Sequence, residues 1–166
     1  TTTNTMNSFA LVDIPDENEP FSAKECINNH FTSIEGVERI CSNCHANEST
    51  IATVLQEPPY FILVLLKRFT SKATRYNTRF YKISSDAIPF FDLDIQTEQG
   101  IFTYDVVASI HHEGLGLHSG HYKAFVAFTS FWFCCDDQRV TLIDTIENKP
   151  SQPIQNAYIL MLKLRH

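Results

Sequence analysis

The chain has 166 residues, of which 43% are hydrophobic and 12% aromatic, so it can form one domain with a sizeable core. A net charge of −6, and apolar runs far shorter than the roughly 18 residues that span a membrane, argue against nucleic-acid and membrane partners. The five cysteines are an odd number, and the sequence opens with no basic segment followed by an apolar one. We therefore expect free thiols and a cytoplasmic and/or nuclear location.

The N-terminal part of the sequence predicts one strand and one helix. Residues 1–8 are rich in Thr and Asn, which is typical of a flexible lead-in, and residues 9–15 read as a short strand. Ser22 followed by Glu25 matches the capping box that opens many helices, and apolar residues recur at helical spacing after it. We expect a helix over 22–31.

The rest of the sequence is dominated by strands. Residues 60–69 are almost all apolar, which predicts a central strand covered on both faces, and the polar, basic residues 70–78 predict a loop. Five further strands with mostly brief connections are expected at 103–112, 121–128, 131–135, 139–144 and 157–164. The expected fold class is α+β, mostly an antiparallel sheet.

His121 stands where a glycine-rich loop becomes a strand. If the strands before and after residues 129–130 form a hairpin with a two-residue turn, His121, Lys123 and Asp136 share one face. Asp136 is then a diagonal neighbour of His121 on the adjacent strand. The backbones of such neighbours lie about 7–8 Å apart, so the two side chains can reach each other to form a hydrogen bond. A three-residue turn would offer Asp137 instead. Either carboxylate would orient the imidazole as a general base; the alternative is a surface pair without chemistry.

Several motifs in a fixed order resemble the ubiquitin-specific proteases, which are papain-like cysteine deubiquitinases. YDVVASIHHEG, GHYKAFV and FWFCCDDQRVTLI resemble the family's histidine region, and PPYFILVLLKRF its central strand. CSNC resembles a zinc-binding turn, KECINNHF the helix before it, and NAYILMLKLR the closing strand. The resemblance implies the palm and part of the fingers of that fold: a lead-in at 1–8, a fingers-like region at 9–59 and the palm at 60–166.

The resemblance also implies roles for individual residues. His121 would be the general base and Asp136 its orienter, with Asp137 as a further polar contributor. The residues that would bind substrate, in the channel for the ubiquitin C-terminal tail and in the loops over it, are Tyr122, Gly120, Ser119 and His112. The loops that close over the tail would be 113–120 and 70–79.

The chain departs from the family at the nucleophile. The family's catalytic cysteine lies in the thumb, in an Asn-x-Gly-x-x-Cys-like box that nothing in this sequence matches. Cys26 falls inside the predicted helix, and neither Cys134 nor Cys135 adjoins a matching helix N-terminus. We therefore expect the chain alone to be inactive and to depend on a thumb segment.

The zinc site implied by the resemblance is also incomplete. Cys41 and Cys44 would supply half of a four-ligand site, and His45 could add a third ligand. The family's first cysteine pair would lie before residue 9, where the sequence has none. We expect no cofactor to be required for catalysis and no complete zinc site within the chain.

The function implied by the resemblance is hydrolysis of the isopeptide bond after the C-terminal glycine of ubiquitin, with ubiquitin or ubiquitinated proteins as partners. Two alternatives stay open: an inactive ubiquitin-binding or scaffold module that lacks the thumb, and a protease for a ubiquitin-like modifier such as SUMO. A module that only binds has no need of both His121 and the Asp136–Asp137 pair, so the sequence favours the enzyme.

Overall fold

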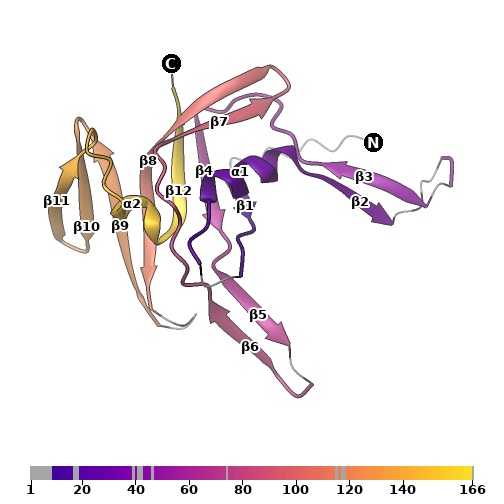
Figure 1. Ribbon diagram of the computed structural model, residues 1–166, viewed down its shortest axis with the longest axis horizontal. Helices are drawn as coiled ribbons and strands as arrows, with labels where there is room; N and C mark the ends of the chain where they lie inside the picture. The colour runs from indigo at the N-terminus through magenta and orange to yellow at the C-terminus, as the bar shows by residue number, and fades with distance from the viewer. Residues whose placement is uncertain are drawn as a thin grey trace.

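The computed structural model describes residues 9–16, 19–38, 40, 43–45, 47–73, 75–114, 116 and 119–165. Its body is an eight-stranded sheet in the order β1–β4–β12–β8–β9–β10–β11, with β7 paired to β8 off this path (Figure 1). The strands are β1 (Phe9–Val12), β4 (Phe61–Leu66), β7 (Asp92–Thr97), β8 (Gly100–Glu113), β9 (His121–Phe128), β10 (Phe131–Asp136), β11 (Arg139–Thr145) and β12 (Ala157–Leu164). Apart from β1 with β4, these strands pair antiparallel, which confirms the expected α+β, mostly antiparallel fold.

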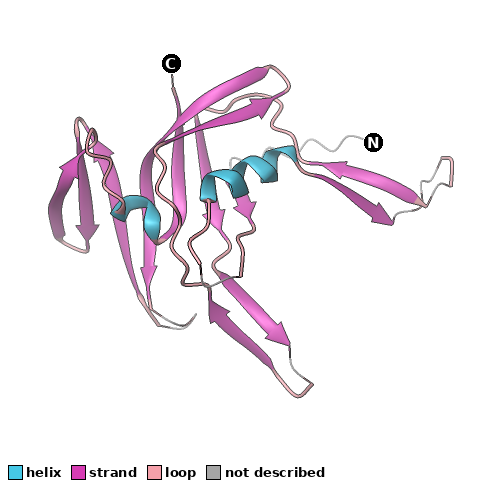
Figure 2. Cartoon of the chain, in the orientation of Figure 1, coloured by secondary structure: helices cyan, strands magenta, loops and turns pink. Residues whose placement is uncertain are grey.

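Two hairpins extend from this sheet in different directions, as Figure 2 shows. One joins β2 (Ile34–Glu38) to β3 (Glu48–Ala52), and the other joins β5 (Phe69–Ala73) to β6 (Thr78–Lys82). The predicted loop at 70–78 is therefore wrong. The two strands contain threonine and aromatic residues, which favour strands, beside the basic residues that suggested a loop.

Helix α1 (Ala23–Thr32) begins where the sequence predicts. The Ser22 side chain accepts a hydrogen bond from the backbone N–H of Glu25, which satisfies one of the donors that a helix N-terminus leaves free. Ala23, Ile27 and Phe31, each four residues apart, are buried. This spacing puts them on one stripe of the helix, which packs into the core.

The core lies against one face of the sheet. In β4, Val64 and Leu66 are fully buried, whereas Phe61 and Leu63 are each 39% exposed. Helix α1 and the short helix α2 (Gln152–Gln155) both contribute to this one core. Neither helix in the described part of the chain is long and apolar enough to cross a membrane. The expectation that the 60–69 strand is covered on both faces is wrong, because both helices lie on the same side.

The opposite face of the sheet is open and apolar. A row of directly paired residues crosses all seven strands of the path on this face: Phe9, Leu63, Met161, Ala108, Val126, Phe133 and Leu142. Around this row, large apolar side chains stand well exposed, among them Leu11 (48%), Phe128 (67%) and Val140 (63%). A sheet usually buries such a face against a second layer.

A buried arginine holds together the segments behind β4. Arg68 is 1% exposed, and its guanidinium donates hydrogen bonds of 2.6 to 3.2 Å to four backbone carbonyl oxygens, those of Ala157, Ile83, Ser85 and Gln155. Burial lowers its pKa to about 10, so the group remains charged at neutral pH. These bonds fix the entry to β12 against the end of β4.

Candidate functional site

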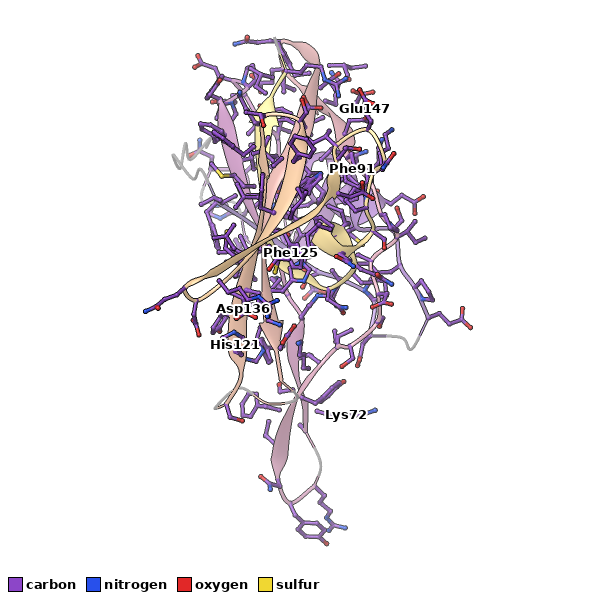
Figure 3. All side chains as sticks on the ribbon, turned by 90° about the vertical axis from the view of Figure 1, so that its left-hand side faces the viewer. Lys72, Phe91, His121, Phe125, Asp136 and Glu147 are labelled. Atoms are coloured by element: carbon purple, nitrogen blue, oxygen red, sulfur yellow. The ribbon has the colours of Figure 1, made fainter. Side chains whose placement is uncertain are left out.

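The β9–β10 hairpin brings the predicted catalytic residues together. Phe128 pairs with Phe131, so the turn has two residues, which is the one of the two alternatives from the sequence that offers Asp136 to His121. His121 begins β9 and Asp136 ends β10, one diagonal step apart on the ladder. Figure 3 shows the two side chains beside each other at one end of the sheet.

The contact between the two side chains is direct. Nε2 of His121 lies 2.5 Å from Oδ1 of Asp136, and their side chains are 42% and 34% exposed. In the described part of the chain, no hydrogen bond engages Nδ1 of His121. Nδ1 is therefore the ring nitrogen left to exchange a proton with another group.

The pair is shifted toward its charged form. The hydrogen bond to Asp136 is the largest cause that raises the pKa of His121; partial burial and the charge of Lys123 oppose it, while Asp136 and Asp137 add to it by their charges. The same hydrogen bond lowers the pKa of Asp136, assisted by Lys123. An ionised carboxylate only accepts hydrogen bonds, so Nε2 carries the proton of the neutral ring and Nδ1 presents a lone pair, as a general base requires.

Asp137 lies in the turn after β10, where its backbone has a positive φ of 51°. Asp137 lies close to the other two side chains: one oxygen or nitrogen atom from each of His121, Asp136 and Asp137 can be chosen so that all three lie within 4.8 Å of one another. The charge of Asp137 helps to raise the pKa of His121. Asp136, not Asp137, makes the hydrogen bond to the imidazole. The contribution of Asp137 to catalysis stays a prediction.

The rings of Tyr122 and His112, which are paired across β8 and β9, contact each other at a tilted angle on the face of the sheet opposite to His121. The Tyr122 side chain points outward and is 57% exposed, whereas His112 beneath it is 5% exposed, with the ring centroids 4.8 Å apart. The ring of Phe69 also packs against the His112 ring, with the two ring centroids 5.5 Å apart. Substrate binding by Tyr122 and His112 stays a prediction, and Tyr122 is the accessible member of the pair.

Gly120 packs directly against His112. A Cβ at Gly120 would overlap the His112 ring and lie 2.7 Å from the carbonyl oxygen of Glu113, so a side chain does not fit there. Ser119, the other predicted substrate contact, is exposed beside it. Of the predicted mobile loop, residues 115, 117 and 118 lie outside the described residues.

Lys82 at the end of β6 ties the β5–β6 hairpin to this loop. Its ammonium donates to the carbonyl oxygens of His112 and, at 3.3 Å, of Gly114. The root of the loop that leads to His121 is therefore fixed to a hairpin that lies 30 residues earlier in the chain.

Lys123 joins the His121–Asp136 pair, a contact that the sequence analysis missed. Nζ of Lys123 lies 3.0 Å from Oε1 of Glu113 and 3.3 Å from Oδ2 of Asp136. The two-residue period of a strand was enough to place Lys123 on the face of His121, but it gave no sign that Glu113 reaches the same cation. Side chains from β8, β9 and β10 thus form one charged network.

The described cysteines do not complete the site. No cysteine in the described part of the chain is hydrogen-bonded to His121, and Cys135 points to the opposite face of β10 from Asp136. Burial raises the pKa of Cys26 and of Cys134, which disfavours the thiolate that a nucleophile needs.

The predicted zinc ligands are placed only in part. Cys41 lies outside the described residues, and Cys44 is an exposed free thiol. Within the described residues, the only cluster of three side chains able to ligate a metal is that of His121, Asp136 and Asp137, which Cys44 does not join. The half zinc site therefore stays a prediction.

Comparison with known proteins decides the family. The model of the ubiquitin carboxyl-terminal hydrolase family matches residues 3–162, nearly the whole chain. The chain belongs to this family. Ubiquitin-specific proteases are the members that it resembles, and these cysteine hydrolases need no cofactor for catalysis.

Two curated relatives show how much of the family's length is present. The chain is 30% identical over 152 residues to the probable ubiquitin carboxyl-terminal hydrolase 8 of Schizosaccharomyces pombe, covering 90% of this chain and 32% of that protein. It is 29% identical over 143 residues to human ubiquitin carboxyl-terminal hydrolase 3, covering 77% and 26%. The chain thus spans about a third or less of the relatives that it matches.

Solved structures give the same fold. A chain of the SAGA Ubp8/Sgf11/Sus1/Sgf73 DUB module bound to ubiquitin aldehyde matches with a TM-score of 0.71 and 20% identity, covering 95% of this chain and 36% of that one. The module bound to monoubiquitin matches with a TM-score of 0.72 and 22% identity, covering 95% and 35%. The chain therefore has the fold of part of a ubiquitin-specific protease catalytic domain.

Proposed function

We propose that this chain supplies the general base, His121, and its orienter, Asp136, to a thiol-dependent deubiquitinase. The reaction is hydrolysis of the isopeptide bond after the C-terminal glycine of ubiquitin. The observation that carries the proposal is the 2.5 Å contact between Nε2 of His121 and an ionised Asp136, which leaves Nδ1 with its lone pair, in a chain of this family.

The chemistry then follows from the ring nitrogens. Nδ1 of His121 takes the proton of a cysteine thiol, and the thiolate attacks the isopeptide carbonyl carbon. As the tetrahedral intermediate collapses, the imidazolium returns its proton to the leaving lysine amine, and a thioester to the enzyme remains. His121 next deprotonates a water molecule, which hydrolyses the thioester and releases ubiquitin. Asp136 stays ionised throughout and stabilises the imidazolium.

The cysteine, in this proposal, belongs to a thumb segment that packs on the palm. The open sheet face supports a further layer, because its row of paired residues from Phe9 to Leu142 is apolar throughout. His121 and Asp136 lie on the other face, so a thumb packed on this row would have to present its cysteine past the end of the sheet. The raised pKa values of Cys26 and Cys134 support it as well, since neither thiol is prepared to act as the nucleophile.

Ubiquitin, free or conjugated, is the proposed partner. A structural neighbour is a DUB module bound to monoubiquitin, and in this chain Tyr122, which follows His121 on β9, offers an exposed ring as a predicted substrate contact. Gly120, which precedes His121, stays a predicted substrate contact through its backbone, because the missing side chain makes room for the His112 ring. The free thiols among the described cysteines fit a cytoplasmic or nuclear location, which remains part of the proposal.

The test is a chimera in which this chain replaces the matching segment of the Schizosaccharomyces pombe relative, assayed with ubiquitin-AMC. We expect the chimera to release AMC and the chain alone to release none. A chimera that binds ubiquitin without turnover would favour the scaffold alternative, and turnover of SUMO-AMC alone would favour a different modifier. Activity of the isolated chain that alkylation of Cys134 or Cys135 abolishes would contradict the thumb as the source of the nucleophile.

A further inference from the structure

Two carboxylates, not one, flank the imidazole of His121. Asp136 approaches from β10, and Glu113 of β8 is paired directly with His121 in the β8–β9 ladder. Directly paired residues have Cβ atoms about 4.5–5.5 Å apart, closer than diagonal ones. By backbone position alone, Glu113 is the nearer partner for the ring, yet the ring is bonded to Asp136.

Lys123 accounts for this choice. It lies on β9 between the two carboxylates, with Nζ 3.0 Å from Oε1 of Glu113 and 3.3 Å from Oδ2 of Asp136. The first contact holds Glu113 away from the ring. The second occupies one oxygen of Asp136 and leaves Oδ1, the other oxygen, to accept from Nε2.

We propose that Lys123 is a positioning residue that selects Asp136 over Glu113 as the partner of His121 and so keeps Nδ1 free. The inference rests on the proposed role of His121 as the base, which it deepens. The side chains of Lys123 and Asp136 are 24% and 34% exposed, so their ion pair is less screened by water than a pair on an open surface, whereas Glu113 is 58% exposed.

The other charged groups that the structure describes near the ring are not placed to restrain Glu113. Asp137 lies in the turn beyond Asp136 and carries a negative charge, so it cannot restrain Glu113. Lys82 of β6 is already bonded to the carbonyl oxygens of His112 and Gly114. Arg139 of β11 is paired with Asp136 in the ladder, but among the described residues only Lys123 forms ion pairs with both carboxylates.

Loss of Lys123 has two consequences for the ring. Glu113 becomes free to bind the imidazole, and any population in which it engages Nδ1 has lost the base. The positive charge of Lys123, which lowers the pKa of His121, disappears as well, so the pKa of His121 should rise. Both effects are local and leave the hydrophobic core untouched.

The test uses the 166-residue chain labelled with ¹⁵N-histidine, in which NMR reports the tautomer and the pKa of His121 directly. We expect the wild-type neutral ring to carry its proton on Nε2. K123M should give a mixture of tautomers and a higher pKa, and K123R should behave as wild type because it keeps the cation. E113Q alone should leave the tautomer unchanged, and the double variant K123M/E113Q should restore it, because the competing carboxylate is gone.

Two outcomes would overturn the proposal: a wild-type tautomer and pKa in K123M, or a tautomer mixture in K123M/E113Q as large as that in K123M. K123Q serves as the neutral variant where K123M does not give a folded backbone amide spectrum. The ring is observed in a chain without the proposed nucleophile. Failure here therefore leaves the deubiquitinase proposal standing, and an inactive chimera leaves this one standing.

Discussion

Nε2 of His121 and Oδ1 of Asp136 lie 2.5 Å apart although the residues are 15 positions apart and on different strands. The contact depends on the length of the turn between β9 and β10. Phe128 pairs with Phe131, and a turn with one more residue would have moved Asp136 to the open face of the sheet. The site is thus set by hairpin register, which a strand ladder fixes more firmly than a loop could.

Removal of the imidazole separates a catalytic role from a structural one. In the ubiquitin-AMC chimera, His121→Ala should lower kcat by at least about a hundredfold, because proton transfer by a positioned base contributes about 10²- to 10⁴-fold. Ubiquitin binding should change only a few-fold. His30→Ala, in α1, is the matched control and should leave kcat unchanged. If binding and turnover fell together, His121 would be structural.

Asp136 should control the titration of His121. Asp136→Ala removes the hydrogen bond that is the largest cause of the raised pKa of His121, so that pKa should fall. Asp136→Asn keeps an acceptor oxygen, so it should preserve the Nε2–H tautomer while lowering the pKa less than Ala does. Both are measured by NMR titration of the ring. A titration unchanged in Asp136→Ala would rule out the contact.

The same pair predicts a pH window of stability. Because the folded-state pKa of His121 is raised, its contribution is complete below the ordinary histidine pKa and is lost as pH rises through the raised value. Because the pKa of Asp136 is lowered, its contribution is present above the ordinary aspartate pKa and is lost as pH falls through the lowered value. The stability difference between wild type and Asp136→Ala, from urea unfolding at several pH values, should be largest between these limits; a difference independent of pH would contradict the prediction.

Gly120 should be intolerant of any side chain. Gly120→Ala forces a Cβ into the His112 ring and toward the carbonyl oxygen of Glu113, so it should destabilise the chain by about 1–3 kcal/mol and shift the NMR signals of His121. Gly116→Ala in the same loop is the control, because a Cβ there meets nothing within 4 Å. Thermal unfolding of the two variants checks the difference, and equal effects would refute the packing argument.

Arg68 should be a main determinant of stability. Arg68→Met removes four hydrogen bonds to backbone carbonyl oxygens in a largely buried region, which should cost about 3 kcal/mol or more in the free energy of unfolding. Its neighbour Lys67 makes a largely exposed ion pair with Asp13, so Lys67→Met should cost less than about 1 kcal/mol. Urea unfolding measures both, and similar values would contradict the assignment.

The sequence was most informative where a local period decides the geometry. Strand alternation and a two-residue turn were enough to bring His121 to Asp136, and the capping pattern at Ser22 was enough to start α1. Arg68 could not be interpreted in the same way, because its carbonyl partners at residues 83–85 and 155–157 reach it only through the tertiary fold.

The errors have physical reasons as well. β4 is apolar on both faces, which predicts that both faces are covered. The sequence of the strand does not tell whether the same chain supplies the layer over the second face. In β5 and β6 the basic residues obscured the threonines and aromatic residues that form the hairpin. The choice between Glu113 and Asp136 depends on where Lys123 places its ammonium, which no spacing rule describes.

Lys82 couples the motions of the β5–β6 hairpin and the glycine loop that leads to His121. A single ammonium holds the carbonyl oxygens at the root of the glycine loop, while its own backbone ends the β5–β6 hairpin. A swing of the hairpin therefore pulls on the loop, and a shift of the loop pulls on the hairpin. We expect the two segments to fluctuate in concert, so that amide relaxation rates in both change when Lys82 is replaced by Met.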